Sequence, residues 1–229
     1  MSICSDGEMG SRLLDIDLII FDCDGVLVDS EVLSCQCLCE TLATCGIKLG
    51  LAEALELFLG RNTAAVLQYY GGQGRPIPNS FLTDLKSRVC QTFQAGLQPI
   101  PGVASLLDNL HTPICLASSS DLDRVRLSLA RTDLASYFGD RLYTSQMVAH
   151  GKPAPDLFLY AASKMQLAPA RTLVIEDSIS GVTAAKAAGM KVWGFCGGSH
   201  YESRDGRAIL SAAGADRVFD RMVDFWMEG

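Results

Sequence analysis

The sequence predicts an α/β fold: a doubly wound, Rossmann-like parallel sheet with a helical cap domain inserted after the first strand. Two observations predict the sheet. Continuous apolar runs of strand length recur along the chain, and amphipathic stretches of helix length lie between most of them. A third observation predicts the insertion, because the long segment between the first two runs has helical character and no convincing strand.

Five apolar runs are candidates for the strands of the sheet. They are continuous rather than alternating, as expected for parallel strands that are covered by helices on both faces. In chain order the runs are Leu18–Phe21, Ile114–Ala117, Leu173–Ile175, Val192–Phe195 and, more weakly, Arg217–Phe219.

Four stretches between these runs are expected to be helices. They stand where parallel strands need crossover connections, and Gly189 directly after the last of them is a typical helix stop. This order of strands and helices is typical of a doubly wound α/β domain. The expected helices are Val103–Leu110, Asp121–Ala130, Pro155–Met165 and Ile179–Ala188.

The insertion is expected to cover residues 32–99. It contains one strong breaker cluster, GGQGRPIPNS at 71–80, and it ends at QPIPG, where two prolines and a glycine return the chain to the α/β pattern. We therefore expect residues 32–99 to form a helical cap domain, and residues 1–31 and 100–229 to form the α/β catalytic core.

Composition and charge exclude several classes of partner. The chain has 229 residues, 48% of them hydrophobic, which suits one large domain or one domain with a smaller insertion. A net charge of -7 gives no electrostatic reason to expect nucleic acid or an anionic membrane as a partner. No apolar stretch has the length of a signal peptide or a membrane span. We expect a soluble cytoplasmic protein, monomeric or weakly homodimeric.

The nine cysteines are interpreted as reduced thiols, several of them packed in the core. Their number is odd, and the cluster Cys35, Cys37, Cys39 and Cys45 lacks the paired C-x2-C spacings and neighbouring histidines of zinc sites. We therefore do not assign a metal to that cluster.

Charged and polar side chains follow the candidate strands where these end, or, as with Lys152, lie in an adjacent loop. Ligands of parallel α/β sheets bind at those carboxyl ends, so the side chains are expected to converge. Each taken alone has a simpler explanation as a helix cap, a turn residue or a surface residue. Together they would repel one another unless a cation binds, and oxygen ligands suit Mg²⁺. In chain order they are Asp22, Asp24, Ser118, Lys152, Glu176 and Asp177.

Four motifs carry a resemblance to a known family. DCDGVLVDS, LASSS, GKPAPD and VIEDS, in this order and spacing, resemble the haloacid dehalogenase (HAD) superfamily, in its branch of phosphatases and phosphomutases with a helical cap after the first motif. The resemblance covers about residues 17–220, and it is strongest to the β-phosphoglucomutase-like group, which includes many sugar-phosphate phosphatases.

The resemblance implies a role for each catalytic residue. Asp22 is the expected nucleophile, which forms an aspartyl-phosphate, and Asp24 is the expected general acid and then general base. Ser118 is expected to donate a hydrogen bond to the phosphoryl group, and Lys152 to neutralise its charge.

The resemblance also implies a Mg²⁺ cofactor. Its expected ligands are a carboxylate oxygen of Asp22, the backbone carbonyl of Asp24, and Asp177. Glu176 is expected either to bind the ion directly or to lie one shell further out.

Three positions bear on the reaction that the resemblance implies. Asp24 favours phosphate esters over halide displacement. Ser34 stands where β-phosphoglucomutases usually have a histidine, and Thr63 where they usually have an arginine that holds a second phosphate. Both departures favour hydrolysis over phosphoryl shuttling.

The expected function is therefore a Mg²⁺-dependent phosphatase of a small phosphorylated metabolite, such as a sugar phosphate. A phosphomutase is the alternative. A non-catalytic binding protein is less consistent with the sequence, because none of the expected catalytic residues is lost. Gly60, Arg61 and Ser119 are the expected substrate-binding residues, and His200 stays without a role.

Overall fold

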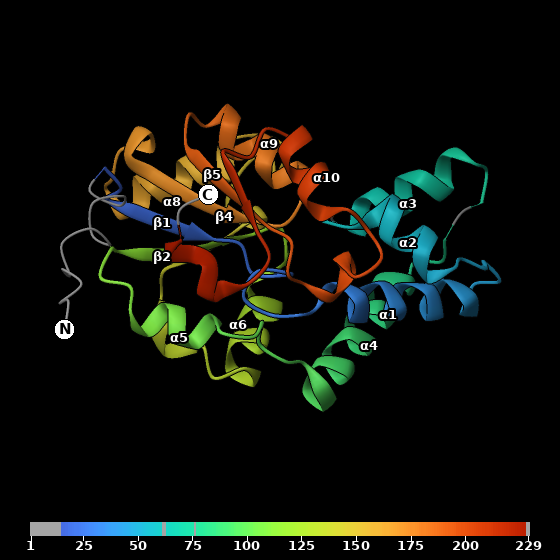
Figure 1. Cartoon of the computed structure of the whole chain (residues 1–229). Helices are drawn as coiled ribbons and strands as arrows, with labels where there is room; N and C mark the ends of the chain where they lie inside the picture. Colours follow the sequence, from blue (N-terminus) through green and yellow to red (C-terminus); the bar gives the residue numbers. More distant parts are fainter. Residues whose placement is uncertain (1–14, 61–62, 76, 228–229) are drawn as a thin grey trace.

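The computed structural model describes residues 15–60, 63–75 and 77–227 (Figure 1). In this part of the chain, six strands form one sheet in the order β3-β2-β1-β4-β5-β6, and every neighbouring pair is parallel. The strands are β1 (Leu18–Phe21), β2 (Ile114–Ser118), β3 (Leu142–Thr144), β4 (Thr172–Glu176), β5 (Lys191–Phe195) and β6 (Arg217–Phe219).

The strand order confirms the predicted doubly wound α/β fold. From β1 the chain winds outward first to β2 and β3 and then, on the other side, to β4, β5 and β6, so the order reverses at β1. Such a switch point leaves a crevice at the carboxyl ends of the strands. The nucleophile candidate Asp22 follows β1 directly, and so it stands at this crevice.

β3 is the strand that the sequence analysis missed. It has only three residues, Leu-Tyr-Thr, and Tyr143 between the buried Leu142 and Thr144 is partly exposed. With a threonine at its end and a partly exposed tyrosine in its middle, it does not form a continuous apolar run. The other five strands begin and end within one residue of the expected bounds.

Helices cover both faces of the sheet, as Figure 1 shows. Their bounds are α5 (Val103–Asp108), α6 (Leu122–Arg131), α7 (Ala135–Phe138), α8 (Asp156–Met165), α9 (Ile179–Ala187) and α10 (Gly206–Ala212). Short 3-10 turns lie at η1 (Ser145–Met147), η2 (Pro169–Arg171), η3 (Ser199–Tyr201) and η4 (Met222–Trp226). The short helices α7 and α10 had not been expected from the sequence.

β1 shows why the apolar runs are continuous. Ile19 and Phe21 belong to the hydrophobic cluster beneath α5, α6 and α7, whereas Leu18 and Ile20 belong to the cluster beneath α8, α9 and α10. All four side chains are fully buried. Because both faces of the strand are covered, each of its residues has to be apolar.

Between β1 and α5 the described residues form four helices: α1 (Glu31–Thr44), α2 (Leu51–Phe58), α3 (Thr63–Gly72) and α4 (Phe81–Gly96). They enclose an apolar cluster of their own, which includes Leu42, Phe58 and Phe81. The chain leaves the α/β part and returns to it side by side, since Ile100 N donates to Leu27 O at 2.9 Å.

The helical segment also packs on the main core. Val89 and Phe93 of α4 lie in the same hydrophobic cluster as Ile19 and Phe21 of β1. The helices are therefore attached to the sheet through apolar packing as well as through the two connecting segments.

Eight cysteines lie in the described residues, and none of these eight forms a disulfide. Those of the Cys35, Cys37, Cys39 and Cys45 group lie on α1 or at its end. Within the same residues, no helix combines the length and the apolar character that a membrane crossing requires.

Candidate active site

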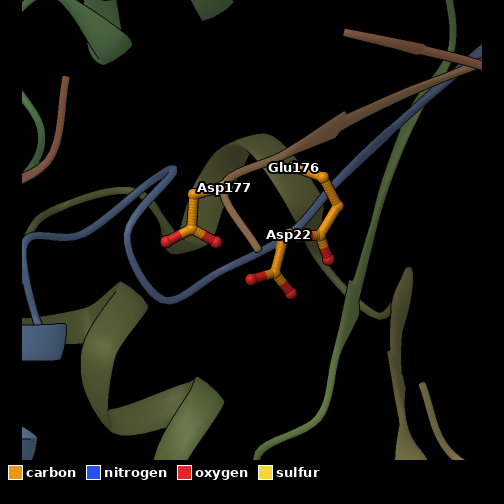
Figure 2. Close-up of side chains that lie close together, drawn as sticks. All are labelled: Asp22, Glu176 and Asp177. Atoms are coloured by element: carbon orange, nitrogen blue, oxygen red, sulfur yellow. The ribbon is translucent and has the colours of Figure 1, made fainter. Parts of the chain in front are cut away.

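The expected site residues converge at the carboxyl ends of β1, β2 and β4. Asp22 directly follows β1, Ser118 is the last residue of β2, and Glu176 is the last residue of β4. Figure 2 shows the carboxylates of Asp22, Glu176 and Asp177 lying close together. The side chains that were expected to converge at the ends of the strands therefore lie close together in the structure.

Lys152 connects two of these carboxylates. Its Nζ donates to Asp22 Oδ1 at 2.7 Å, to the Ala117 carbonyl at 3.0 Å, and to Glu176 Oε1 at short range. Only 2% of the lysine side chain is exposed. Burial alone would lower the pKa of Lys152, but the charges of Asp22 and Glu176 outweigh it and raise that pKa above its usual value. Lys152 is therefore a permanent buried cation.

Lys152 does not compensate all of the negative charge. Burial, first of all, raises the pKa of Asp22 well above its usual value, and Lys152 opposes this shift only in part. The pKa of Asp177 is raised in the same way, by burial and then by the charge of Glu176. A second cation at this point would stabilise both carboxylates in their ionised form.

The three carboxylates fit a divalent cation. One oxygen from each of Asp22, Glu176 and Asp177 lies within 4.8 Å of the others. Asp177 Oδ2 is buried and accepts no hydrogen bond. Both oxygens of Glu176 are already engaged, Oε1 by Lys152 and Oε2 by the backbone and hydroxyl of Ser178. The free acceptor positions therefore belong to Asp22 and Asp177, and oxygen donors of this kind suit Mg²⁺.

Asp24 is held by three donors that the sequence analysis did not single out. Its Oδ1 accepts from Ser30 Oγ at 2.6 Å and from Arg124 Nη2 at 2.7 Å, and its Oδ2 accepts from Ser120 Oγ at 2.6 Å. Burial alone would raise the pKa of Asp24, but Arg124 and the two serines outweigh it, so the pKa lies below its usual value. Asp24 is therefore an ionised, oriented carboxylate.

Two glycines give the carboxylates their space. Gly25 has a φ of +75°, and a Cβ on it would overlap the carboxylate of Asp177. A Cβ on Gly181, in the first turn of α9, would overlap the carboxylate of Glu176. The close approach of both backbones to the acidic groups thus depends on residues without a side chain.

His200 lies against this cluster. Its side chain is fully buried, and its Nε2 lies 3.1 Å from Asp177 Oδ2, although the two atoms are not aligned as a hydrogen bond. Burial, above all, lowers the pKa of His200, so the ring is neutral at physiological pH. The sequence alone assigned this histidine no role.

A pocket of about 320 Å³ opens above the carboxylates. Its base includes Asp22, Asp24, Ser118, Lys152 and Asp177, and its opposite wall comes from the inserted helices. That wall is largely apolar, with Leu38, Phe58, Val66, Leu85 and Val89 among its residues. This size is in the range of small-molecule sites, about 300–1,000 Å³.

Gly60 and Ser119, two of the expected substrate-binding residues, line the pocket. The third, Arg61, lies outside the described residues. Gly60 has a φ of +66°, and its carbonyl accepts from Ser180 Oγ at 3.5 Å, so the inserted segment meets the start of α9 here.

Comparisons with known proteins identify the family of the chain. The family model described as "Haloacid dehalogenase-like hydrolase" matches residues 19–195. A 6-phosphogluconate phosphatase of Escherichia coli K12 is 27% identical over 81% of this chain and 85% of its own length. A phosphorylated carbohydrates phosphatase of Thermotoga maritima is 30% identical over 86% of this chain and 91% of its own.

A solved structure has the same arrangement of elements. The HAD family hydrolase of Deinococcus radiodurans R1, crystallised with bound phosphate and sodium, is 35% identical with a TM-score of 0.73. The alignment covers 92% of this chain and 93% of that one.

Proposed function

Because the chain belongs to the haloacid dehalogenase-like hydrolase family, we propose that it is a Mg²⁺-dependent phosphatase of a small phosphorylated metabolite. The observation that carries the proposal is the buried group formed by Asp22, Lys152 and Asp177. It combines a nucleophile, a permanent cation and unsatisfied oxygen ligands at the base of a pocket.

Asp22 is the proposed nucleophile. Its free oxygen attacks the phosphorus of the ester in line with the leaving group, so that a bond from Asp22 to phosphorus forms while the ester bond breaks. Lys152 holds the other oxygen, at 2.7 Å, and keeps the carboxylate oriented. Ser118, buried at the end of β2, would donate a hydrogen bond from its hydroxyl group to the transferring phosphoryl group.

Asp24 is the proposed acid and base. As an acid it gives its proton to the departing alkoxide, and as a base it takes a proton from the water that breaks the aspartyl-phosphate, which restores its own proton. The lowered pKa of Asp24 favours the base step. The acid step requires that Asp24 takes up a proton when a phosphate dianion occupies the pocket, because a nearby negative charge raises the pKa of a carboxyl.

A Mg²⁺ ion would be held by Asp22, by Asp177 and by the backbone carbonyl of Asp24. When bound, it would neutralise the developing charge on the phosphoryl oxygens. Glu176 would then not contact the ion directly, since its two oxygens already accept hydrogen bonds from Lys152 and Ser178. In this role Glu176 positions Lys152 rather than binding the ion.

The inserted helices are the proposed cap. The described residues of segment 32–99 supply the pocket wall that faces the catalytic carboxylates. This segment would therefore exclude water and contact the organic part of the substrate. The names of the two curated relatives favour a phosphorylated sugar or sugar acid as substrate. Ser34 and Thr63, as uncharged side chains, favour hydrolysis over the alternative of a phosphomutase.

The experiment is phosphate release from an aryl phosphate, with Mg²⁺ and after exhaustive treatment with EDTA. We expect Mg²⁺-dependent hydrolysis, with poor recovery in Ca²⁺ because that ion takes a larger and looser coordination shell. A panel of sugar phosphates and phosphorylated sugar acids then identifies the substrate class. Full activity after chelation would reject the metal site, and conversion of a hexose phosphate to its isomer would favour the mutase.

A further inference from the structure

Arg124 is a charged residue of the pocket to which neither the family motifs nor the proposed chemistry assigns a role. It lies on α6, and its backbone N–H donates to Asp121 Oδ1 at 2.9 Å, which fixes this arginine at the start of the helix. The guanidinium leaves the helix and enters the pocket beside Asp24, with 23% of the side chain exposed.

The guanidinium contacts three parts of the molecule at once. Its Nη2 donates to Asp24 Oδ1 at 2.7 Å and to Ser34 Oγ, on α1, at 2.9 Å. Its plane lies over the ring of Phe93 on α4, with 5.0 Å between Cζ and the ring centre. One side chain of the α/β part therefore connects the catalytic loop to two helices of the inserted segment.

The contacts close a ring of hydrogen bonds. Ser34 Oγ, which accepts from Arg124, donates to the Ser30 carbonyl at 2.6 Å. Ser30 Oγ in turn donates to Asp24 Oδ1, also at 2.6 Å. A shift of α1 relative to α6 would break this ring, so the orientation of the Asp24 carboxylate depends on the position of α1.

We propose that Arg124 is a positioning residue, which fixes the Asp24 carboxylate for proton transfer and makes that orientation depend on α1 through Ser34. The inference rests on the proposed phosphatase activity. Proton transfer requires hydrogen-bond reach between the carboxylate and the leaving oxygen, and a misplacement of about 1 Å costs on the order of 100-fold in rate. Arg124 itself touches neither the phosphorus nor the leaving group.

An arginine suits this position better than a lysine. Two protons on one nitrogen serve Asp24 and Ser34 together, while the flat group packs on Phe93. A lysine ammonium would restore the charge but not this combination of directed contacts. The substitution Arg124→Lys therefore separates positioning from simple charge neutralisation.

The test compares two esters that differ in their need for an acid. p-Nitrophenyl phosphate has a leaving group that departs without a proton, whereas glycerol 1-phosphate, an alkyl ester, needs one. We would measure kcat and KM on both, with Mg²⁺ present, for the wild type, Arg124→Gln, Arg124→Lys and Ser34→Ala. Arg126→Gln is the matched control, because Arg126 is exposed on the same helix.

For Arg124→Gln we expect kcat/KM to fall about 100-fold on the alkyl ester and less than about threefold on the aryl ester. On the aryl ester kcat and KM should fall together, because breakdown of the aspartyl-phosphate still needs Asp24 as a base. Arg124→Lys should stay at least tenfold below the wild type on the alkyl ester. Ser34→Ala should show the same pattern with a smaller loss, of about fivefold, and Arg126→Gln should show none.

Equal losses of kcat/KM on both esters would overturn the inference, since Arg124 would then act on the phosphoryl group or on folding. Full rescue by Arg124→Lys, or unchanged kinetics in Arg124→Gln, would overturn it as well. If Arg124→Gln does not fold, as judged by thermal unfolding, Ser34→Ala still decides the question because it leaves no charge unpaired. A wild type inactive on both esters would instead overturn the proposed function.

Discussion

At the scale of single residues, the buried charges around Lys152 dominate the site. Its ammonium group stands between Asp22 and Glu176, with all three side chains 10% exposed or less. Removing charges from water is costly, and each is tolerated here because the others compensate it. The arrangement is a poor way to stabilise a fold, but the hydrogen bond from Lys152 orients the carboxylate of Asp22.

Lys152→Ala should therefore destabilise the protein. Two buried carboxylates would lose their cation, and breaking such a pair lowers the free energy of unfolding by about 3–5 kcal/mol. Urea unfolding at neutral pH measures the loss, and the exposed Lys48→Ala should change the value by less than about 0.5 kcal/mol. Equal stability of both variants would show that the buried ion pairs contribute nothing to the fold.

At the scale of elements, the first turn of α9 determines where Glu176 can lie. Ser178 caps this helix by accepting from the Gly181 N–H at 3.0 Å, and its hydroxyl also donates to Glu176 Oε2. Gly181 leaves room for the glutamate carboxylate. A helix start, a strand end and the lysine of another loop are thus fixed by one small set of contacts.

Gly181→Ala should displace Glu176 and weaken its pairing with Lys152. Overpacking of this kind lowers the free energy of unfolding by about 1–3 kcal/mol. The control is Gly71→Ala in α3, where an added Cβ meets nothing within 4 Å. That change should be neutral or stabilising by up to about 1 kcal/mol. Urea unfolding compares the two variants, and equal effects would contradict the steric role of Gly181.

The elements also show which parts of the fold and of the site can be predicted from the sequence. Buried on both faces, the strands appear as continuous apolar runs, and the carboxylates follow at their ends, so strand ends and acidic groups could be predicted together. The donors to Asp24 could not. Serine and arginine are common on loops and helix surfaces. Only the tertiary fold brings Ser30, Ser120 and Arg124 to one carboxylate.

At the scale of the whole molecule, the α/β part and the inserted helices share both a core and a pocket. Val89 and Phe93 of α4 pack into the main hydrophobic cluster, while Val89 also lines the pocket. A change of position of the helices would alter the pocket wall and the Arg124 contacts together. The sequence predicted the helical insertion, but not which of its side chains reach the core.

Metal binding should be visible in the stability of the whole protein. Without a metal, the raised pKa values of Asp22 and Asp177 mean that the folded state keeps protons that the unfolded chain has released. The contribution of these two groups to stability therefore falls as the pH rises from about 4 through their folded pKa values. Mg²⁺ competes with those protons, so its stabilising effect should grow with pH.

We expect a Mg²⁺ concentration of about 100 times the Kd at pH 8 to raise Tm by about 5–10 °C at that pH. The same concentration should raise Tm by much less at pH 5, because protons then occupy the carboxylates. Thermal unfolding with and without Mg²⁺ across this pH range gives the difference directly. Asp177→Asn, which lacks one of the proposed ligands, should abolish most of the shift. An effect of Mg²⁺ that is independent of pH would argue against binding to these carboxylates.

The proposed chemistry is tested most directly by trapping the phosphoryl group on Asp22. In Asp24→Asn the first step still proceeds with p-nitrophenyl phosphate, whose leaving group needs no proton, but the water that breaks the aspartyl-phosphate has no base. Rapid mixing, acid quenching and mass spectrometry of the digested protein locate the phosphoryl group. We expect a burst of nitrophenolate of about one equivalent per protein, with the phosphoryl group on Asp22. A burst without phosphorylation of Asp22, or a phosphoryl group on another residue, would contradict the mechanism.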